Sequence, residues 1–348
     1  MRNPFRAIAR PIALRVNPFR RALFLAHIAV LGFTAALASA MATAQSDAFI
    51  LSRPGRTIAL QPYGPNILRV TLSTQKPAAL AAPGYGIIGA PSSTGWSHTT
   101  DSAGYDVYRS SDMVIRITPE NLSAPHRLPL DDLNNKLRDV YFGGGPPRQG
   151  PFDDTLSVET ATGAPLLTMR QWSMYPNQPR PSASHPANAQ QDDPGYRIAA
   201  VFDSPAGEHY YGLGQHQQGF LDLRDHRIDC WHNYGAIGGE TVCVPFMVSS
   251  RRYGLIWDNP SKTTVDLGFN LRNTWSSAVG DRVSFFVIAG SSFDNIYEGY
   301  RQLTGVAHLL PKPAYGYIQS KAIYPTQSQL MAIAKGYRDR NLPLDVLV

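Results

Sequence analysis

The stretch from Tyr210 to Asn259 constrains the fold more than any other part of this sequence. It begins with aromatic residues spaced by glycines, Tyr-Tyr-Gly-Leu-Gly-Gln-His-Gln-Gln-Gly at 210–219. Apolar residues then recur at the two-residue period of a strand, at Val242, Val244, Phe246 and Val248. A tight polar connection leads into another aromatic strand at 253–259. This order predicts one part of a β-sandwich.

Short alternating segments of the same kind recur between residues 45 and 290. In the strand predicted at 67–73, one face is apolar and the other polar: Leu68, Val70 and Leu72 against Arg69, Thr71 and Ser73. Similar strands are predicted elsewhere, at 113–117, 196–202 and 283–289, with Gly, Pro, Asn and Asp between them. Many short strands with little helical periodicity predict an antiparallel sandwich. Five prolines near 175–195 mark a surface insertion within it.

The first forty-four residues have the order of a secretory signal. Six arginines and no acid come first, then an apolar run at 22–40, then the small residues Ala42-Thr43-Ala44. We therefore expect residues 1–44 to be removed, the mature protein to be periplasmic or secreted, and no stable membrane association to remain after cleavage. An uncleaved N-terminal anchor is the alternative, because the apolar run is near the length that spans a bilayer.

Charge and cysteine content narrow the function classes. The six leader arginines account for the whole formal net charge of +6, so the mature part is balanced. It contains no basic stripe interleaved with stacking aromatics, which argues against a nucleic-acid partner. Cys230 and Cys243 are the only cysteines. They form either one bridge across neighbouring strands or two free buried thiols, and neither lies in a metal-ligand spacing.

After Gly290 the spacing of the apolar residues changes from the two-residue period of strands to the spacing of a helix. A helix is predicted from residues at helical spacing behind Ser291 or Ser292 as N-cap, with Gly305 closing it: Phe293, Ile296, Tyr297, Tyr300 and Leu303. This helix and a Pro-bounded connector occupy 291–312. A strand at 315–320, a helix opened by a capping box at 326–329 and a strand at 344–348 follow. A lone strand–helix–strand unit cannot cover its apolar faces, so we expect a larger domain of which 313–348 is the start.

Several phrases, in this order, resemble glycoside hydrolase family 31, the α-glucosidases and α-xylosidases. They are Tyr211-Gly212-Leu213-Gly214, the phrase from Pro245 to Leu255, the helix phrase at 299–305, and the barrel phrases at 315–321 and 337–346. The resemblance implies a mainly β fold: a galactose-mutarotase-like β-sandwich followed by the first strand–helix–strand of a truncated (β/α)8 TIM barrel. It also implies a retaining α-glycosidase that acts on an oligosaccharide, with no cofactor and no metal.

The resemblance assigns no catalytic residue to this chain. The family's catalytic aspartates lie on later barrel strands, and a retaining mechanism needs two carboxylates about 5 Å apart. Asp222, Asp225 and Asp229 lie among arginines in the sandwich, and we interpret them as solvated strand ends paired with those neighbouring arginines. The residues 1–348 alone are therefore expected to be inactive. His216, His226 and His232 match no metal spacing.

Four residues are candidates for substrate binding. Asn233 and Tyr234 lie in the connection at 231–240, which resembles the family's sandwich loop that reaches the mouth of the active site. Ser320 and Lys321 end the first barrel strand, where barrel active sites are built. Ile318 replaces the aromatic residue usual in the family on that strand. Aromatic rings could add a sugar platform or lie in the core: Trp231, Tyr234, Trp257 and Trp275.

Three functional hypotheses follow. The first is an exported α-xylosidase or α-glucosidase, represented by its N-terminal portion. The second is a stand-alone carbohydrate-binding sandwich without catalysis, although such a module needs no strand–helix–strand tail. The third is a frameshifted product without a folded role. The sequence does not indicate the sugar, the linkage or the oligomeric state.

Overall fold

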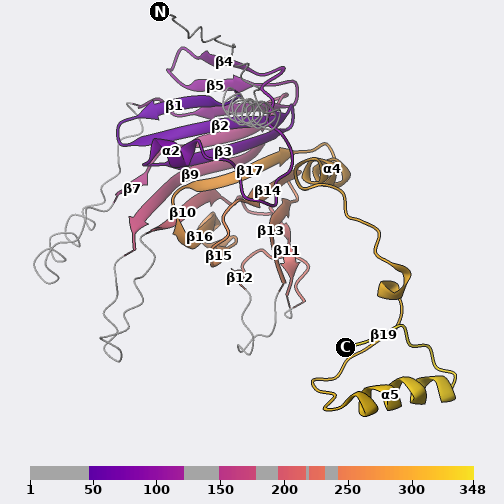
Figure 1. The fold of residues 1–348 in the computed structure, drawn as a ribbon. Helices are drawn as coiled ribbons and strands as arrows, with labels where there is room; N and C mark the ends of the chain where they lie inside the picture. Colours follow the sequence, from indigo (N-terminus) through magenta and orange to yellow (C-terminus); the bar gives the residue numbers. More distant parts are fainter. Residues whose placement is uncertain (1–46, 121–148, 178–194, 217–218, 232–241) are drawn as a thin grey trace, which may run out of the picture. The chain divides into compact units, whose positions relative to one another are not determined.

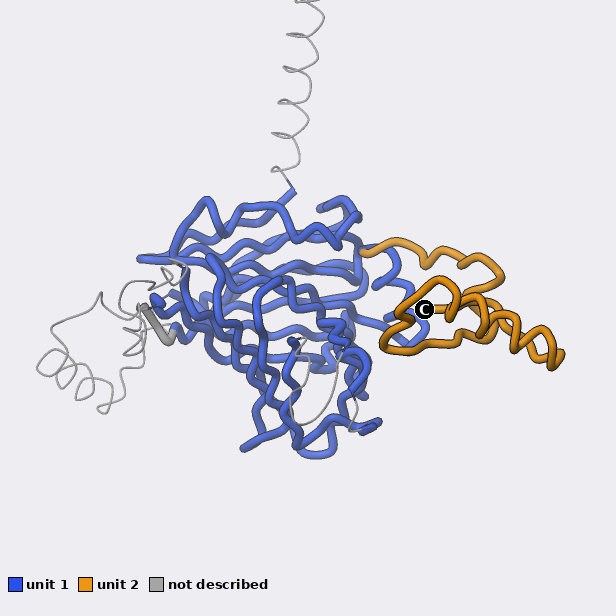
Figure 2. The backbone as a smooth tube through the Cα atoms, turned by 60° about the horizontal axis from the view of Figure 1, so that its bottom comes forward, with its two compact units in different colours: residues 1–303 blue, residues 304–348 orange. Residues whose placement is uncertain are grey.

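The computed structural model of the chain describes residues 47–120, 149–177, 195–216, 219–231 and 242–348 (Figure 1). The expected leader at 1–44, most of the Pro-rich insertion, and the connection that carries Asn233 and Tyr234 lie outside these ranges. Two compact units divide the chain, residues 1–303 and residues 304–348 (Figure 2). Among the described helices, none has the length and apolar character needed to cross a membrane.

The first unit is built from two antiparallel sheets. The order in the first sheet is β1 (Phe49–Arg53), β2 (Arg56–Gly64), β3 (Ile67–Ser73), β17 (Val283–Ala289), β14 (Tyr253–Trp257), β13 (Val242–Ser249) and β11 (Tyr210–Gln215). The order in the second sheet is β12 (Arg227–Cys230), β15 (Thr263–Asp266), β16 (Arg272–Gly280), β10 (Tyr196–Asp203), β9 (Pro165–Pro176), β8 (Leu156–Thr160), β6 (Met113–Ile117), β5 (Asp106–Arg109) and β4 (Ser97–Thr100). β7 (Gln149–Phe152) pairs with β9, and short helical turns lie at α2 (Lys76–Ala79) and η2 (Phe269–Leu271). The predicted antiparallel strand architecture is confirmed.

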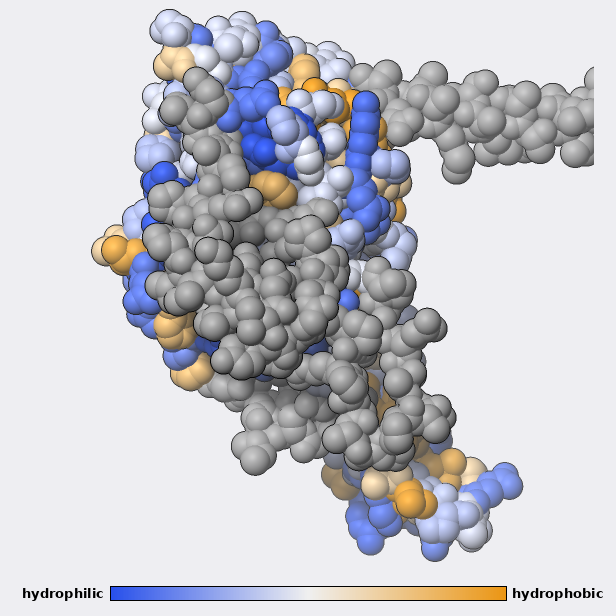
Figure 3. Space-filling view, turned by 90° about the vertical axis from the view of Figure 1, so that its left-hand side faces the viewer, coloured by the Kyte–Doolittle hydropathy of each residue, from blue (hydrophilic) through white to orange (hydrophobic). Residues whose placement is uncertain are grey.

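The core fills the space between the two sheets. Trp257 from the first sheet stacks on Trp275 from the second with ring centroids 5.6 Å apart, and Phe285 meets Phe202 edge to face at 5.3 Å. Each such side chain removed from water contributes about 1.5–3 kcal/mol. On the face drawn in Figure 3, hydrophilic residues make up much of the described surface. Because Trp257 and Trp275 are at most 1% exposed, the sugar-platform interpretation is wrong for both.

Strand β3 is buried on both faces. Its apolar face, Leu68, Val70 and Leu72, joins the core between the sheets, as the alternation predicted. The opposite face is buried as well: Ile67 clusters with Ile296 and Leu303 of helix α4 (Phe293–Thr304), and α2 contacts β2 and β3. The polar face of the predicted strand therefore does not meet solvent.

Helix α4 approaches the first sheet closely. A Cβ on Gly299 would lie 2.5 Å from Cγ2 of Ile288, so only glycine fits at this contact. The hydroxyl of Ser292 accepts a hydrogen bond from the amide of Asn295, and Gly305 follows the helix with a φ of 88°. The predicted N-cap and C-terminal glycine of this helix are confirmed.

Buried arginines are paired with buried aspartates. Arg69 on β3 donates to the carboxylate of Asp258 at 3.1 Å and to the hydroxyl of Ser284 at 3.1 Å. At the β1–β2 hairpin, Arg53 and Arg56 both donate to Asp154, each with one contact of 2.6 Å, and the indole of Trp172 donates to the same carboxylate at 3.0 Å. Asp154 therefore ties the first sheet to the second.

A disulfide joins Cys230 to Cys243, with Cα atoms 5.1 Å apart. Of the two alternatives left open by the sequence, the bridge is the correct one. It does not link neighbouring strands, however. Cys230 ends β12 at the edge of the second sheet and Cys243 lies in β13 of the first sheet, so the bridge connects the two layers of the sandwich.

The second unit contains a parallel strand–helix–strand. Strand β18 (Ile318–Gln319) pairs in parallel with β19 (Val346–Leu347), and helix α5 (Gln327–Asp339) lies between them in sequence. The hydroxyl of Thr326 accepts a hydrogen bond from the amide of Gln329, which confirms the predicted N-cap. Strand β18 is shorter than the strand predicted at 315–320: Tyr315 belongs to the 3-10 turn η3 (Lys312–Tyr315), and only Ile318 and Gln319 pair with β19. The larger barrel stays a prediction.

Replacing Asp154 by Asn should lower the free energy of unfolding by about 3–5 kcal/mol, because Arg53 and Arg56 would lose the buried carboxylate that they share. Burial raises the pKa of Asp154, but hydrogen bonds and charges from Arg56, Trp172 and Arg53 outweigh it, so the pKa is lowered. The stability from this pair should therefore be present above the ordinary Asp pKa of about 4 and be lost as the pH falls through the lower folded pKa.

Urea unfolding at several pH values measures both effects. The control is Asp101→Asn, whose carboxylate pairs with Arg116 at the surface and should cost no more than about 1 kcal/mol. Equal costs for the two variants would contradict the structural role of Asp154.

Reduction of the disulfide should lower the free energy of unfolding by about 3 kcal/mol, because the bridge restricts the unfolded chain between Cys230 and Cys243. Thermal unfolding with and without a reductant measures this loss. The double variant Cys230→Ser, Cys243→Ser should match the reduced parent and ignore the reductant, since the chain has no other cysteine. A parent that unfolds identically in both conditions would rule out a stabilising bridge.

Candidate functional site

The glycine-spaced motif forms a bulged strand against β13. Strand β11 pairs with β13 in antiparallel register, and the register shifts between Gly212 and Gly214. Both glycines have positive φ, 103° and 93°, and a Cβ on Gly212 would lie 2.6 Å from the carbonyl oxygen of Phe246. At Gly214 the carbonyl of Val242 is closer still. The motif is therefore a close approach of two strands and not a phosphate loop.

We define the loop edge as β11, β12 and the start of β13, together with the described segment between the first two, because these elements flank the connection at 232–241. Large apolar side chains are exposed here: Phe220, Leu221, Trp231 and Val242. Exposed apolar residues in such numbers at one edge are typical of a binding surface.

Trp231 is the residue of the loop edge best suited to contact a sugar. Its side chain is 44% exposed, and Nζ of Lys262 lies 4.1 Å from the centroid of its ring. Another exposed ring of the loop edge, Phe220, stacks on the imidazole of His226 with ring centroids 3.8 Å apart. Flat exposed rings bind the apolar faces of sugars, and a cation beside the ring can donate to a hydroxyl. Of the four aromatic residues proposed from the sequence, Trp231 is the one that the described structure exposes.

The predicted binding residues fall in two places. Asn233 and Tyr234 lie outside the described residues. Ser320 and Lys321 directly follow β18 in the second unit, and both are exposed. The amide of Lys321 donates to the carbonyl of Val348 at 3.2 Å, and its Nζ lies 5.8 Å from the centroid of the Tyr324 ring. These two residues lie at the carboxyl end of a parallel strand, where the sequence placed them, and their binding role stays a prediction.

The aspartates between β11 and β12 have structural partners, but not all are the predicted arginines. Asp222 accepts from Nδ1 of His209 at 2.6 Å and from the amides of Arg224 and Tyr210. Burial raises the pKa of Asp222, and these hydrogen bonds outweigh burial and lower it. Asp229 accepts from the hydroxyl of Thr264.

The arginines between β11 and β12 and in β12 bind residues other than these aspartates. Arg227 makes a two-contact ion pair with Asp266, at 2.6 and 2.9 Å, and Arg224 donates to the hydroxyl of Ser204 and the carbonyl of Glu208. The prediction of acid–arginine pairs among sequence neighbours is therefore wrong for Asp222 and Asp229, because the sheet pairing brings other residues to them. Across the described ranges, no three His, Cys, Asp or Glu side chains come together as a metal site. His232 lies outside those ranges.

Among the buried carboxylates that sequence reasoning missed, Glu208 lies beside the glycine-spaced motif. It precedes β11, is 3% exposed and accepts from the hydroxyl of Ser249 at 2.5 Å. Burial raises the pKa of Glu208, although Ser249 and the charge of Arg251 partly oppose this. A polar Ser249-Ser250 pair at the end of an apolar strand was the available signal. Glu208 anchors the beginning of the bulged strand and does not face the loop edge as a free acid.

Comparison with known proteins agrees with this architecture. Residues 57–266 match the family model described as the glycosyl hydrolase 31 N-terminal galactose mutarotase-like domain. An α-xylosidase of Saccharolobus solfataricus is 38% identical over 161 residues, which cover 44% of this chain and 21% of that protein. α-Glucosidase 2 of Bacillus thermoamyloliquefaciens is 33% identical over 149 residues, 40% of this chain and 19% of that protein. The match thus spans about a fifth of each relative.

Solved structures share the fold. An α-xylosidase of this family from Xanthomonas citri has a TM-score of 0.62 at 16% identity, covering 86% of this chain and 44% of that chain. An α-xylosidase from a soil metagenome, complexed with xylose, has a TM-score of 0.60 at 23% identity, covering 87% and 40%. At these identities the likeness shows the fold alone. The predicted mainly β, mutarotase-like fold is confirmed.

Replacing Glu208 by Gln should change how stability depends on pH. Because the pKa of Glu208 is raised in the folded state above its ordinary 4.5, the folded state holds more protons between the two values, and stability falls as the pH rises through that window. The variant lacks this loss, so its Tm relative to the parent should increase from pH 4.5 upward.

Thermal unfolding between pH 4 and 8 tests this, with the exposed Glu120→Gln as control. A constant difference in Tm between the Glu208 variant and the parent would show that Glu208 does not titrate in the folded protein.

Proposed function

The chain belongs to glycoside hydrolase family 31, and we propose that it serves hydrolysis of O-glycosyl bonds as part of a retaining α-glycosidase. The observation behind this proposal is the family-model match over 57–266, which covers most strands of the sandwich and contains the Gly212–Gly214 bulge. The substrate class that fits is an oligosaccharide with α-linked xylose or glucose at its non-reducing end. The names of the curated relatives, an α-xylosidase and an α-glucosidase, support that class.

The described residues support a binding role more than a chemical one. A retaining mechanism needs one carboxylate as nucleophile and a second as acid and base, about 5 Å apart. The buried carboxylates Asp154, Glu208 and Asp258 are each held by arginine or serine side chains. We infer that the reacting carboxylates belong to the catalytic barrel beyond Val348. Trp231, Asn233 and Tyr234 are then candidates for sugar contacts in the first unit, and Ser320 and Lys321 are separate candidates in the second.

Export is part of the proposal. The basic, apolar and small-residue order at 1–44 supports secretion or a periplasmic location. The bridge between Cys230 and Cys243 supports an oxidising compartment, since such bonds persist outside the cytosol.

A second candidate is a carbohydrate-binding sandwich that acts without catalysis. The exposed ring of Trp231 beside Lys262 is the observation in its favour.

Purified residues 45–348 should not hydrolyse aryl α-xylosides or aryl α-glucosides above background, because two suitably placed carboxylates are required. A product extended beyond Val348 through the downstream reading frame should hydrolyse one of them with retention of anomeric configuration. Release of the aryl group measures turnover, and NMR of the first sugar product gives the anomer. Activity of the shorter protein would overturn the assignment of chemistry to the barrel; sugar binding without activity in either would favour the binding module.

A further inference from the structure

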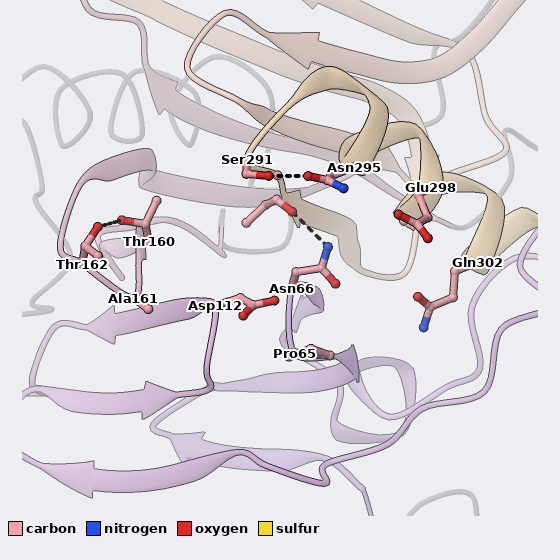
Figure 4. A pocket seen from close by; sticks show the side chains of 13 residues that line it. Pro65, Asn66, Asp112, Thr160, Ala161, Thr162, Ser291, Asn295, Glu298 and Gln302 are labelled. Carbon is pink, nitrogen blue, oxygen red and sulfur yellow. Dashed lines mark hydrogen bonds between the residues drawn. The ribbon is translucent and has the colours of Figure 1, made fainter.

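An open groove of about 630 Å³ lies where three turns of the first unit meet helix α4 (Figure 4). We call it the turn groove. The β2–β3 turn supplies Asn66, the β5–β6 turn supplies Asp112, and the β8–β9 turn supplies Thr160 to Thr162. Helix α4 supplies the opposite side, including Glu298 and Gln302. The groove is therefore formed by turns of both sheets and one helix, and it shares no lining residue with the loop edge.

The walls of the turn groove are tied together. The hydroxyl of Ser110 donates to the carbonyl of Pro65 at 2.5 Å, which joins the β5–β6 turn to the β2–β3 turn. The amide of Ala161 donates to the carbonyl of Asp112 at 2.9 Å, which adds the β8–β9 turn. Asn66 Nδ2 then donates to the carbonyl of Ala289 at 3.0 Å, next to α4. A ligand would meet a site that is already ordered, so it would lose little free energy in ordering it.

These contacts engage side-chain amide nitrogens that line the groove, so the oxygens of the same side chains remain available to accept hydrogen bonds from a ligand. Because Nδ2 of Asn66 is engaged, its Oδ1 remains, and Figure 4 shows that oxygen within the groove. Gln302 Nε2 donates to the carbonyl of Tyr63 at 2.8 Å, which leaves Oε1. The carboxylate of Glu298 has no cationic partner among the described residues. Asn295 is oriented the other way: its Oδ1 accepts from Ser291, which leaves Nδ2 as a donor.

This set of groups selects a class of ligand. No lysine or arginine lines the groove within the described residues, and the carboxylates of Asp112 and Glu298 would repel an anion. The described residues offer no three-residue metal cluster. A neutral sugar fits, because each hydroxyl can donate to a carboxylate or amide oxygen and accept from an amide nitrogen. The volume lies in the range of about 300–1,000 Å³ of small-molecule sites.

We propose that the turn groove is a second carbohydrate-binding site, which holds a short segment of a neutral oligosaccharide. The identity of the sugar rests on the proposed function: an α-linked glucose or xylose oligosaccharide. Because the groove belongs to the sandwich alone, binding there needs no catalytic carboxylate. It would increase the local concentration of the oligosaccharide on the protein.

Titration of the ¹⁵N-labelled protein with maltotriose, isomaltotriose or an α-xylosyl-glucose disaccharide tests the proposal. The side-chain amide resonances of Asn66, Asn295 and Gln302 should shift together with one Kd. Glu298→Gln should raise that Kd about tenfold, the loss expected for one hydrogen bond to a charged group. Asp294→Asn is the matched control, since Asp294 is an exposed acid on the same helix that does not line the groove. It should leave the Kd unchanged.

Two results would overturn the proposal: no shift of these amides with any of the three sugars, or equal effects of the Glu298 and Asp294 variants. Shifts with putrescine and none with sugar would instead identify an amine site. The outcome is separate from the proposed activity, because aryl glycoside turnover by the extended protein does not require the groove. Loss of sugar shifts with retained turnover would reject the groove alone.

Discussion

The face-to-face packing of two sheets is the constraint on which the rest of this structure depends. It places Trp257, Trp275 and Phe285 where water cannot reach them. Every polar group carried into that region must then find a partner within the protein, because an unpaired buried charge costs several kcal/mol. The two hairpin arginines therefore meet Asp154, and Arg69, which is buried on the other face of the first sheet, meets Asp258 for the same reason. Burial of the arginines makes these ion pairs necessary, because each buried charge needs a partner of opposite charge.

The same constraint decides where function can lie. Side chains between the sheets pack in the core. Most of the carboxylates described above accept hydrogen bonds from arginines, hydroxyls or amides. A catalytic acid or nucleophile must keep a lone pair or proton available for substrate, which a carboxylate held by two arginines does not. Recognition is different, because it needs only exposed rings and free donors and acceptors. The connections of the sandwich offer these at Trp231 and around Asn66 and Glu298.

Local sequence pattern predicted what depends on neighbouring residues. The two-residue alternation gave the strands, the serine and glycine around residues 291–305 gave the ends of α4, and Thr326 gave the cap of α5. It could not predict what covers each face. Alternation in β3 places Leu68 and Arg69 on opposite sides, but the burial of Arg69 depends on its contacts with Ala81, Ser284 and Asp258, which lie outside the strand. The partners of Asp222 and Asp229 and the burial of Glu208 were missed for the same reason.

For the disulfide, the sequence offered the correct bond as one alternative but placed it between the wrong kind of strands. Two cysteines thirteen residues apart suggest a bridge between neighbouring strands, because a hairpin is the simplest way to return the chain. Here the chain leaves β12 of one sheet and enters β13 of the other, so the bridge closes a crossover between layers. A bridge in that position fixes both ends of the connection at 232–241 without adding a ladder hydrogen bond. The two sheets are then held together by covalent bonding at the loop edge, by Asp154 at the β1–β2 hairpin and by the aromatic core between them. The flanks of the connection that carries Asn233 and Tyr234 are thus held by strands of two different sheets and not by pairing with each other.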